Sequence, residues 1–154
     1  MNKVNKNKKI VYVDMDDTIA DYRKSMLENP YNLDYPQSVE GFYLGLQPIP
    51  MAIESVKYID TLPDYDVWFL TAPSVINAHS YTEKRLWIEK YFGHDKCHQL
   101  ILSPHKGLLL GHYLIDDITF GKGQESFTGK LIHYGSEDFS SWGDIIKYFE
   151  NGGI

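Results

Sequence analysis

A short apolar run that ends in three carboxylates constrains this chain more than any other feature. Residues 10–13 are Ile-Val-Tyr-Val, and Asp14, Asp16 and Asp17 follow at once. A run of β-branched and aromatic residues predicts a buried strand. Carboxylates crowded at its end repel one another and raise one another's pKa. A sequence that breaks a local rule in this way points to a function, here a metal ion, a nucleophile, or both.

Length and composition favour one folded domain in a reducing compartment. The chain has 154 residues, of which 43% are hydrophobic, enough for a proper core. Its net charge of −6 argues against a nucleic-acid polymer as partner. Cys97 is the single cysteine, which excludes an intramolecular disulfide. Because the sequence shows no signal peptide and no apolar run long enough to cross a bilayer, we expect a cytoplasmic protein without a membrane partner.

Strands alternate with helices along the chain. After the first strand, apolar runs predict four more, at residues 67–71, 99–102, 113–115 and 130–134. Helices are expected at residues 50–62, 80–92, 103–110 and 141–149. Ser80 and Glu83 are spaced as a capping box for the second of these helices. The alternation, with continuous apolar strand cores, predicts an α/β fold: a Rossmann-like three-layer sandwich with a central parallel sheet.

The segment after the first strand breaks this alternation. Residues 19–46 mix helix formers with proline and glycine and carry several aromatic residues. We therefore expect a small helical cap inserted after the first strand at residues 19–46. The core would comprise residues 10–18 and 47–150, and residues 1–9 would form a solvated basic tail.

Candidate chemical groups gather at the ends of four predicted strands. Parallel strands end at the same edge of a sheet, where open α/β sheets bind their ligands. The residues expected at this edge are Asp14, Asp16, Thr71, Lys106, Asp116 and Asp117. Several carboxylates in one crevice suit Mg²⁺, and a carboxylate can also act as a nucleophile through an aspartyl-phosphate.

Two of these strand ends also predict a binding site for an anion. We expect Thr71 to lead into a helix that begins at Pro73, whose free backbone amides would suit a phosphate. Lys106 is expected in the first turn of its own helix, where its charge opposes the helix dipole. A phosphate partner would explain that unfavourable placement. Lys84 is either a solvated helix residue or an addition to the same positive field.

The run Asp14-Met15-Asp16-Asp17-Thr18 resembles the first signature motif of the haloacid dehalogenase (HAD) phosphatases. Thr71, Lys106 and the pair Asp116-Asp117 are similar to the second, third and fourth motifs of that superfamily. The resemblance implies a HAD-like core and a phosphatase reaction that uses Mg²⁺.

Within this superfamily the chain most resembles the 5'(3')-deoxyribonucleotidases. Residues 41–50 are similar to that family's link from cap to core, and residues 81–93 to its long helix. The likeness extends over residues 10–149. It implies hydrolysis of deoxyribonucleoside monophosphates, a step of deoxyribonucleotide catabolism, with a nucleotide as small-molecule partner and a homodimer as oligomeric state.

The resemblance also implies a role for each matched residue. Asp14 would attack phosphorus, while Asp16 would protonate the leaving oxygen and then activate water. Mg²⁺ would be held by Asp14, Asp116 and the carbonyl of Asp16, with Asp117 supporting the metal shell. The remaining roles are phosphate binding by Thr71, the Ala72 amide and Lys106, and substrate binding by Tyr22, Tyr43 and Leu44.

Departures from the family pattern leave other functions open. Ala72 stands where relatives often carry serine, Pro104 and His105 stand where mammalian relatives carry arginine, and the cap is short. A sugar phosphate or another small phosphomonoester is therefore an alternative substrate. A phospho-receiver module is a further alternative, disfavoured because the third predicted strand ends in Ser103-Pro104 and because a receiver has no counterpart of Asp16.

Overall fold

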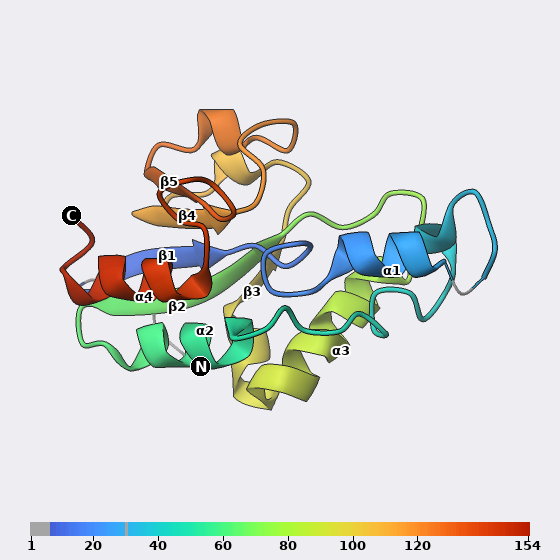
Figure 1. The fold of residues 1–154 in the computed structure, drawn as a ribbon, viewed down its shortest axis with the longest axis horizontal. Coiled ribbons are helices and arrows are strands. Elements are labelled where there is room, and N and C mark those ends of the chain that lie inside the picture. The colour runs from blue at the N-terminus through green and yellow to red at the C-terminus, as the bar shows by residue number, and fades with distance from the viewer. Residues whose placement is uncertain (1–6, 30) are drawn as a thin grey trace.

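A five-stranded parallel sheet forms the centre of the fold, which the computed structural model describes for residues 7–29 and 31–154 (Figure 1). The strands are β1 (Lys9–Val13), β2 (Tyr65–Thr71), β3 (Leu100–Leu102), β4 (Tyr113–Asp116) and β5 (Lys130–His133). Their order is β3-β2-β1-β4-β5, and every neighbouring pair is parallel. The predicted α/β fold with a Rossmann-like parallel sheet is therefore confirmed.

Three long helices pack on one face of this sheet: α2 (Ala52–Thr61), α3 (Ser80–Phe92) and α4 (Trp142–Glu150). Their inward residues share one buried cluster with alternate residues of β1. Trp87 of α3 donates a hydrogen bond to the Leu46 carbonyl at 2.8 Å, and Trp142 of α4 donates to the Thr18 carbonyl at 3.1 Å. The two indoles thus tie the helices to both ends of the segment that follows β1.

Loops with short 3-10 helices cover the opposite face. A smaller buried cluster around Tyr12 and Leu114 lies there, beneath η3 (Lys106–Leu108) and η4 (Gln124–Ser126). The predicted helix over residues 103–110 is wrong, since η3 is the helical part of that range. The Ser103 hydroxyl bonds both the amide and the carbonyl of His105, a local pattern that favours a turn over a helix.

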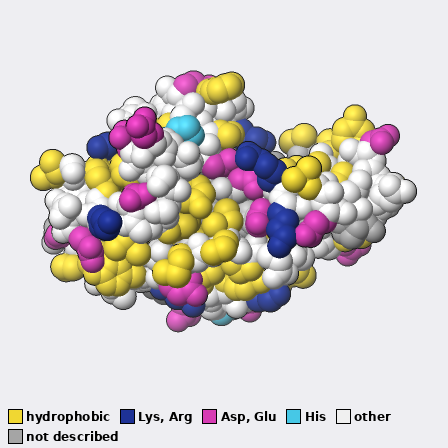
Figure 2. Space-filling view, in the orientation of Figure 1, with side chains coloured by type: hydrophobic (Ala, Val, Ile, Leu, Met, Phe, Trp, Pro, Cys, Tyr) yellow, Lys and Arg dark blue, Asp and Glu magenta, His cyan; other side chains and the backbone are white. Residues whose placement is uncertain are grey.

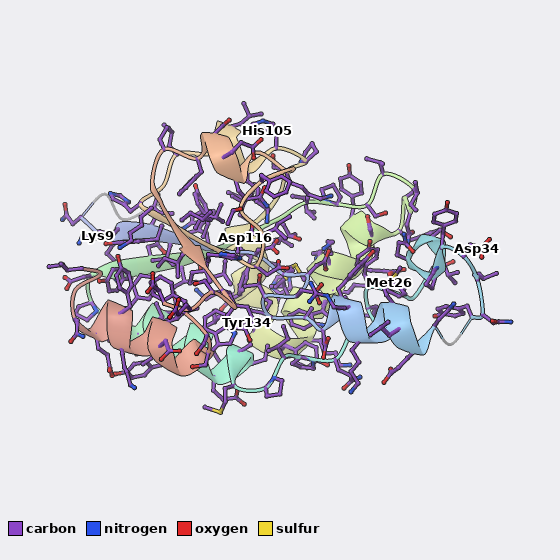
Figure 3. All side chains as sticks on the ribbon, turned by 45° about the horizontal axis from the view of Figure 1, so that its top comes forward. Lys9, Met26, Asp34, His105, Asp116 and Tyr134 are labelled. Atoms are coloured by element: carbon purple, nitrogen blue, oxygen red, sulfur yellow. The ribbon has the colours of Figure 1, made fainter. Side chains whose placement is uncertain are left out.

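The segment after β1 projects from the sheet as a lobe that carries α1 (Tyr22–Glu28) and η1 (Pro36–Ser38) (Figure 1). Figure 3 shows Met26 and Asp34 out on this lobe, whereas Asp116 lies in the interior. Phe42 and Leu46, where the lobe returns, are buried in the main core. A helical insertion after the first strand is thus present, while its boundaries at residues 19–46 stay a prediction.

α3 begins later after β2 than the sequence suggests. Residues 72–79 form a loop, so the predicted helix start at Pro73 is wrong. The predicted capping box is also wrong, because the N-cap is His79 and it makes no side-chain hydrogen bond. The Ser80 hydroxyl instead accepts a hydrogen bond from the Ser74 amide at 3.0 Å, which closes the loop onto the helix. η2 (His94–Gln99) follows α3 directly.

The two remaining expectations concern the tail and membranes. The predicted basic tail lies mostly on residues 1–6, outside the described residues, and Lys9 already pairs with Tyr65 in the sheet. None of the helices in the described ranges is both long and apolar enough to cross a membrane.

Candidate active site

A tight turn after β1 places Asp14 and Asp16 at the carboxyl edge of the sheet. The Met15 carbonyl accepts hydrogen bonds from three following amides, those of Thr18, Ile19 and Ala20. Asp17 adopts a left-handed φ of 56°, a conformation that aspartate tolerates better than most residues. Its carboxylate accepts a hydrogen bond from the Arg23 amide at 2.7 Å. Asp17 therefore has a structural role: it joins this turn to the start of α1.

Lys106 bridges two carboxylates that come from neighbouring strands. Its Nζ lies 2.6 Å from Oδ1 of Asp14 and 2.5 Å from Oδ2 of Asp116, and all three side chains are buried. Burial lowers the pKa of Lys106, but the charges of Asp14 and Asp116 outweigh that effect and raise the pKa overall. The expected helix dipole at Lys106 is absent because η3 has three residues. Carboxylates, not a dipole, set the charge environment of this lysine.

Three carboxylates converge at the ends of β1 and β4. Asp14, Asp116 and Asp117 each present one oxygen, and these oxygens lie within 4.8 Å of one another. Burial, with the charge of Asp14, raises the pKa of Asp116 to about 6 and that of Asp117 to about 7. Such shifts mean that burial and mutual repulsion destabilise the ionised carboxylates. A bound divalent cation would offset that destabilisation. A set of carboxylate oxygens suits a hard cation, so the residues present fit the predicted metal site.

Asp16 faces away from this cluster, toward α3. Its Oδ2 lies 2.8 Å from Nζ of Lys84, which also donates a hydrogen bond to Oγ1 of Thr71 at 2.9 Å. Burial raises the pKa of Asp16, and the Lys84 charge opposes the rise. The second oxygen, Oδ1, is buried and has no hydrogen-bond partner within residues 7–29 and 31–154. Asp16 therefore has one oxygen fixed by a lysine and one available to a ligand.

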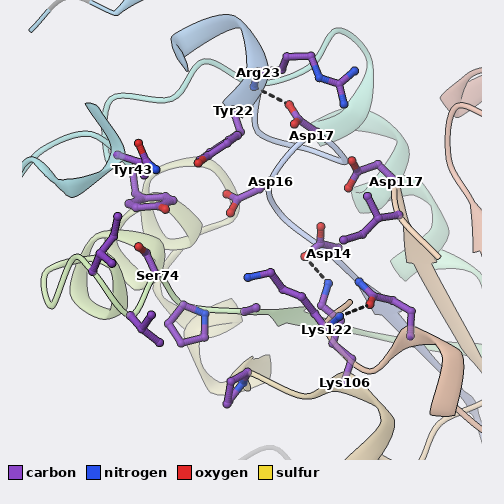
Figure 4. A pocket seen from close by; sticks show the side chains of 18 residues that line it. Asp14, Asp16, Asp17, Tyr22, Arg23, Tyr43, Ser74, Lys106, Asp117 and Lys122 are labelled. Carbon is purple, nitrogen blue, oxygen red and sulfur yellow. Dashed lines mark hydrogen bonds and ion pairs between the residues drawn. The ribbon is translucent and has the colours of Figure 1, made fainter. Parts of the chain in front are cut away.

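An open cavity of about 510 Å³ lies between the sheet edge and the lobe (Figure 4). Figure 2 shows acidic and basic side chains gathered where the body of the molecule meets this lobe. The cavity is lined by most of the predicted site residues, namely Asp14, Asp16, Asp117, Lys106, Ala72, Tyr22 and Tyr43. The strand-end pattern and the family resemblance together thus predicted residues that the fold brings to one cavity.

The other predicted site residues lie behind or beside the cavity. Thr71 and Asp116 are fully buried and reach the site through Lys84 and Lys106, respectively. Leu44 is half-buried and does not line the cavity, so its contact with a substrate stays a prediction that the geometry does not support.

The aromatic wall of the cavity is held by a carboxylate of α3. The Tyr22 and Tyr43 rings stack with centroids 6.1 Å apart. The carboxylate of Glu83 accepts hydrogen bonds from the backbone amides of Gly41 at 2.6 Å and Tyr43 at 3.0 Å. Glu83, expected to cap its own helix, therefore clamps the returning lobe segment onto α3.

Sequence reasoning missed several groups of the site. Lys122, Gln124, Arg23 and Ser74 also line the cavity. Gln124 is buried and donates a hydrogen bond to Oδ2 of Asp116 at 3.1 Å. The one signal available was the run Gly121-Lys122-Gly123, since two glycines around a charged residue indicate a special backbone turn.

Comparisons with known proteins agree with these features. No protein-family model matches the chain. It is 34% identical, over 148 residues, to a Vibrio phage KVP40 protein assigned to the 5'(3')-deoxyribonucleotidases, covering 92% of this chain and 85% of that protein. It is 39% identical over 85 residues to the cytosolic 5'(3')-deoxyribonucleotidase of Homo sapiens and 37% identical over 78 residues to the mitochondrial one. These two alignments cover 55% and 51% of this chain but 42% and 34% of the human proteins, less than half of their length.

Proposed function

We propose a function from one premise: the chain belongs to the 5'(3')-deoxyribonucleotidase family, within the HAD superfamily. The proposed reaction is the Mg²⁺-dependent hydrolysis of deoxyribonucleoside monophosphates through an aspartyl-phosphate. One observation carries the proposal. Asp14 and Asp16 face the same cavity, Asp14 within the carboxylate and lysine cluster and Asp16 with a free buried oxygen.

The first half of the reaction forms a bond between Asp14 and phosphorus. As an oxygen of Asp14 attacks, the bond from phosphorus to the sugar oxygen breaks, and Oδ1 of Asp16 donates the proton that this oxygen needs. The Asp16 side chain suits that part because its other oxygen is anchored on Lys84. Lys106 stabilises negative charge that develops on the transferring group.

The second half regenerates the enzyme. Asp16, now a carboxylate, takes a proton from a water molecule whose oxygen attacks phosphorus. The bond from phosphorus to Asp14 breaks, inorganic phosphate leaves, and Asp14 returns to a carboxylate. The predicted phosphate ligands for both halves are the Ala72 amide, at the cavity wall, and Thr71, whose hydroxyl accepts a hydrogen bond from Lys84.

Mg²⁺, when bound, would neutralise part of the negative charge of the phosphate and of Asp14. Asp14, Asp116 and the Asp16 carbonyl would hold it. The raised pKa of Asp117 and its place in the carboxylate cluster support a part for this residue in the metal shell.

A phosphate-release panel tests the proposed function. With Mg²⁺, the protein should release phosphate from dUMP or dTMP with a higher kcat/KM than from sugar phosphates. The Asp14→Asn variant should release no phosphate from either class of substrate. Faster turnover of sugar phosphates would replace the nucleotide by the alternative substrate class. Failure to hydrolyse any nucleotide or aryl phosphate would contradict the phosphatase function.

The remaining expectations are part of this proposal. A homodimer, a cytoplasmic location and the absence of polymer or membrane partners go with a small-molecule nucleotidase. Human relatives of both cytosolic and mitochondrial type exist, and the free Cys97 is compatible with a reducing compartment.

A further inference from the structure

The loop between β4 and β5 is built to present one lysine. Gly121 and Gly123 flank Lys122 and have left-handed φ values of 98° and 84°, which side-chain-bearing residues rarely adopt. A Cβ added at Gly123 would meet Nδ1 of His105 at 2.5 Å. Both glycines are therefore needed for the course of the backbone on either side of Lys122.

Hydrogen bonds fix this loop to two residues of the candidate site. The Lys122 carbonyl accepts from the Lys106 amide at 2.7 Å, and the Lys122 amide donates to Oε1 of Gln124 at 2.9 Å. The Gln124 amide group in turn donates to Oδ2 of Asp116 at 3.1 Å. Hydrogen bonds thus link the backbone of Lys122 directly to Lys106, a predicted phosphate ligand, and through Gln124 to Asp116, a predicted metal ligand.

The Lys122 side chain enters the cavity. It is part of the lining, and Figure 4 shows it extending toward the space between Asp16 and Ser74. A lysine held at its backbone but free at its ammonium group can follow a ligand of variable shape.

Two lysines at the cavity already have acidic partners. Lys106 pairs with Asp14 and Asp116, and Lys84 pairs with Asp16. The Arg23 charge lowers the pKa of Asp17 against the larger effect of burial. Within the described ranges no carboxylate lies within ion-pairing distance of Lys122. Of the lysines at the cavity in this part of the chain, Lys122 is therefore the one whose charge no ion pair compensates.

We propose that Lys122 binds the phosphate group of the substrate. The proposal rests on the proposed function, because it places the transferring phosphate in this cavity. Lys122 would bind phosphate before and during the reaction. Its loss should therefore raise KM and the Kd for inorganic phosphate more than it lowers kcat.

Calorimetric titration of inorganic phosphate into the Mg²⁺-loaded protein tests this assignment. Lys122→Met should weaken phosphate binding about tenfold or more, as expected when a charge-assisted hydrogen bond is lost. Lys122→Arg should keep most of the affinity. Lys147→Met, which removes an exposed lysine of α4, is the matched control for net charge and should bind as the unmodified protein does.

Kinetics on the same variants separate this inference from the proposed function. If Lys122→Met binds phosphate within about twofold of the unmodified protein, the assignment is wrong even where nucleotide hydrolysis is normal. If the unmodified protein hydrolyses no phosphomonoester, the proposed function fails, while the phosphate titration still decides whether Lys122 binds the anion. A raised KM with a nearly unchanged kcat in Lys122→Met, but not in Lys147→Met, supports both the Lys122 assignment and the proposed function.

Discussion

The ammonium group of Lys84 lies 2.8 Å from Oδ2 of Asp16, and the lysine side chain is 1% exposed. A charged lysine is almost never buried without a partner. The same ammonium group also reaches Oγ1 of Thr71. One residue of α3 therefore positions side chains from the ends of two strands, the proposed general acid and a predicted phosphate ligand.

Replacement of Lys84 by methionine should impair the chemical step more for poor leaving groups than for good ones. Without Lys84, Asp16 loses its anchor, and acid–base catalysis contributes on the order of 100-fold or more to rates of this kind. Hydrolysis of a nucleotide, whose sugar oxygen needs a proton, should slow more than hydrolysis of p-nitrophenyl phosphate, whose leaving group does not. The measurement is the ratio of the two kcat values.

Arg85→Met on the same helix is the control, because Arg85 makes an exposed ion pair with Glu89. Equal loss of activity toward both substrates in Lys84→Met would show that Lys84 acts on overall stability and not on Asp16.

Replacement of Glu83 by glutamine should loosen the lobe segment that carries Tyr43. The carboxylate accepts hydrogen bonds from the Gly41 and Tyr43 amides, and a hydrogen bond to a charged group is worth about 1.5–3 kcal/mol. We expect a lower free energy of unfolding and a higher KM for nucleotides, with metal affinity unchanged. Denaturant unfolding and steady-state kinetics measure these effects.

Glu89→Gln, on the exposed side of α3, should leave both quantities near those of the unmodified protein. A Glu83→Gln variant with normal stability and normal KM would contradict the clamp.

The sequence predicted the sheet and the acidic strand ends from short-range patterns, whereas Tyr22, Tyr43 and Ala72 were predicted from the family resemblance. The apolar run of β1 and the Asp14 that follows it are adjacent in the sequence, and so are the apolar run of β4 and Asp116. Glu83 was assigned to a capping box because its spacing from Ser80 fits one. In the folded chain its partners are the Gly41 and Tyr43 amides, 42 and 40 positions away. A spacing rule cannot show such a choice between local and distant hydrogen bonds.

Lys122 was missed for a related reason. Its position in the cavity depends on a backbone path set by two left-handed glycines and by the Lys106 amide. The two glycines indicate a special turn, but no periodicity or motif shows where in the fold that turn lies, because loops follow from tertiary contacts as much as from their own residues.

The stability of the metal-free protein should fall as pH rises. The pKa values of about 6 for Asp116 and about 7 for Asp117 lie above the value of about 3.9 for unfolded aspartate. Between these values the folded state binds more protons than the unfolded state, so the free energy of unfolding decreases with pH. Thermal melting without divalent cations should therefore give a lower Tm at about pH 8 than at about pH 5.5.

Mg²⁺ should reverse this trend, because bound metal replaces protons on the carboxylates. The increase in Tm on adding Mg²⁺ should be larger at the higher pH. Asp117→Asn removes the highest of these pKa values and should flatten the pH dependence of the metal-free Tm. A metal-free Tm that rises steadily over the same window would contradict the raised pKa values.

The central claim is that Asp14 becomes covalently phosphorylated, and Asp16→Asn offers the most direct way to see it. Without its acid–base group, this variant should still accept a phosphoryl group from p-nitrophenyl phosphate but should hydrolyse the aspartyl-phosphate slowly. Mass spectrometry of acid-quenched protein should show a gain of one phosphoryl group, mapped to the peptide that contains Asp14 and lost in the double variant with Asp14→Asn. Quenched protein with no added phosphoryl group, while the unmodified enzyme turns over the same substrate, would contradict the account.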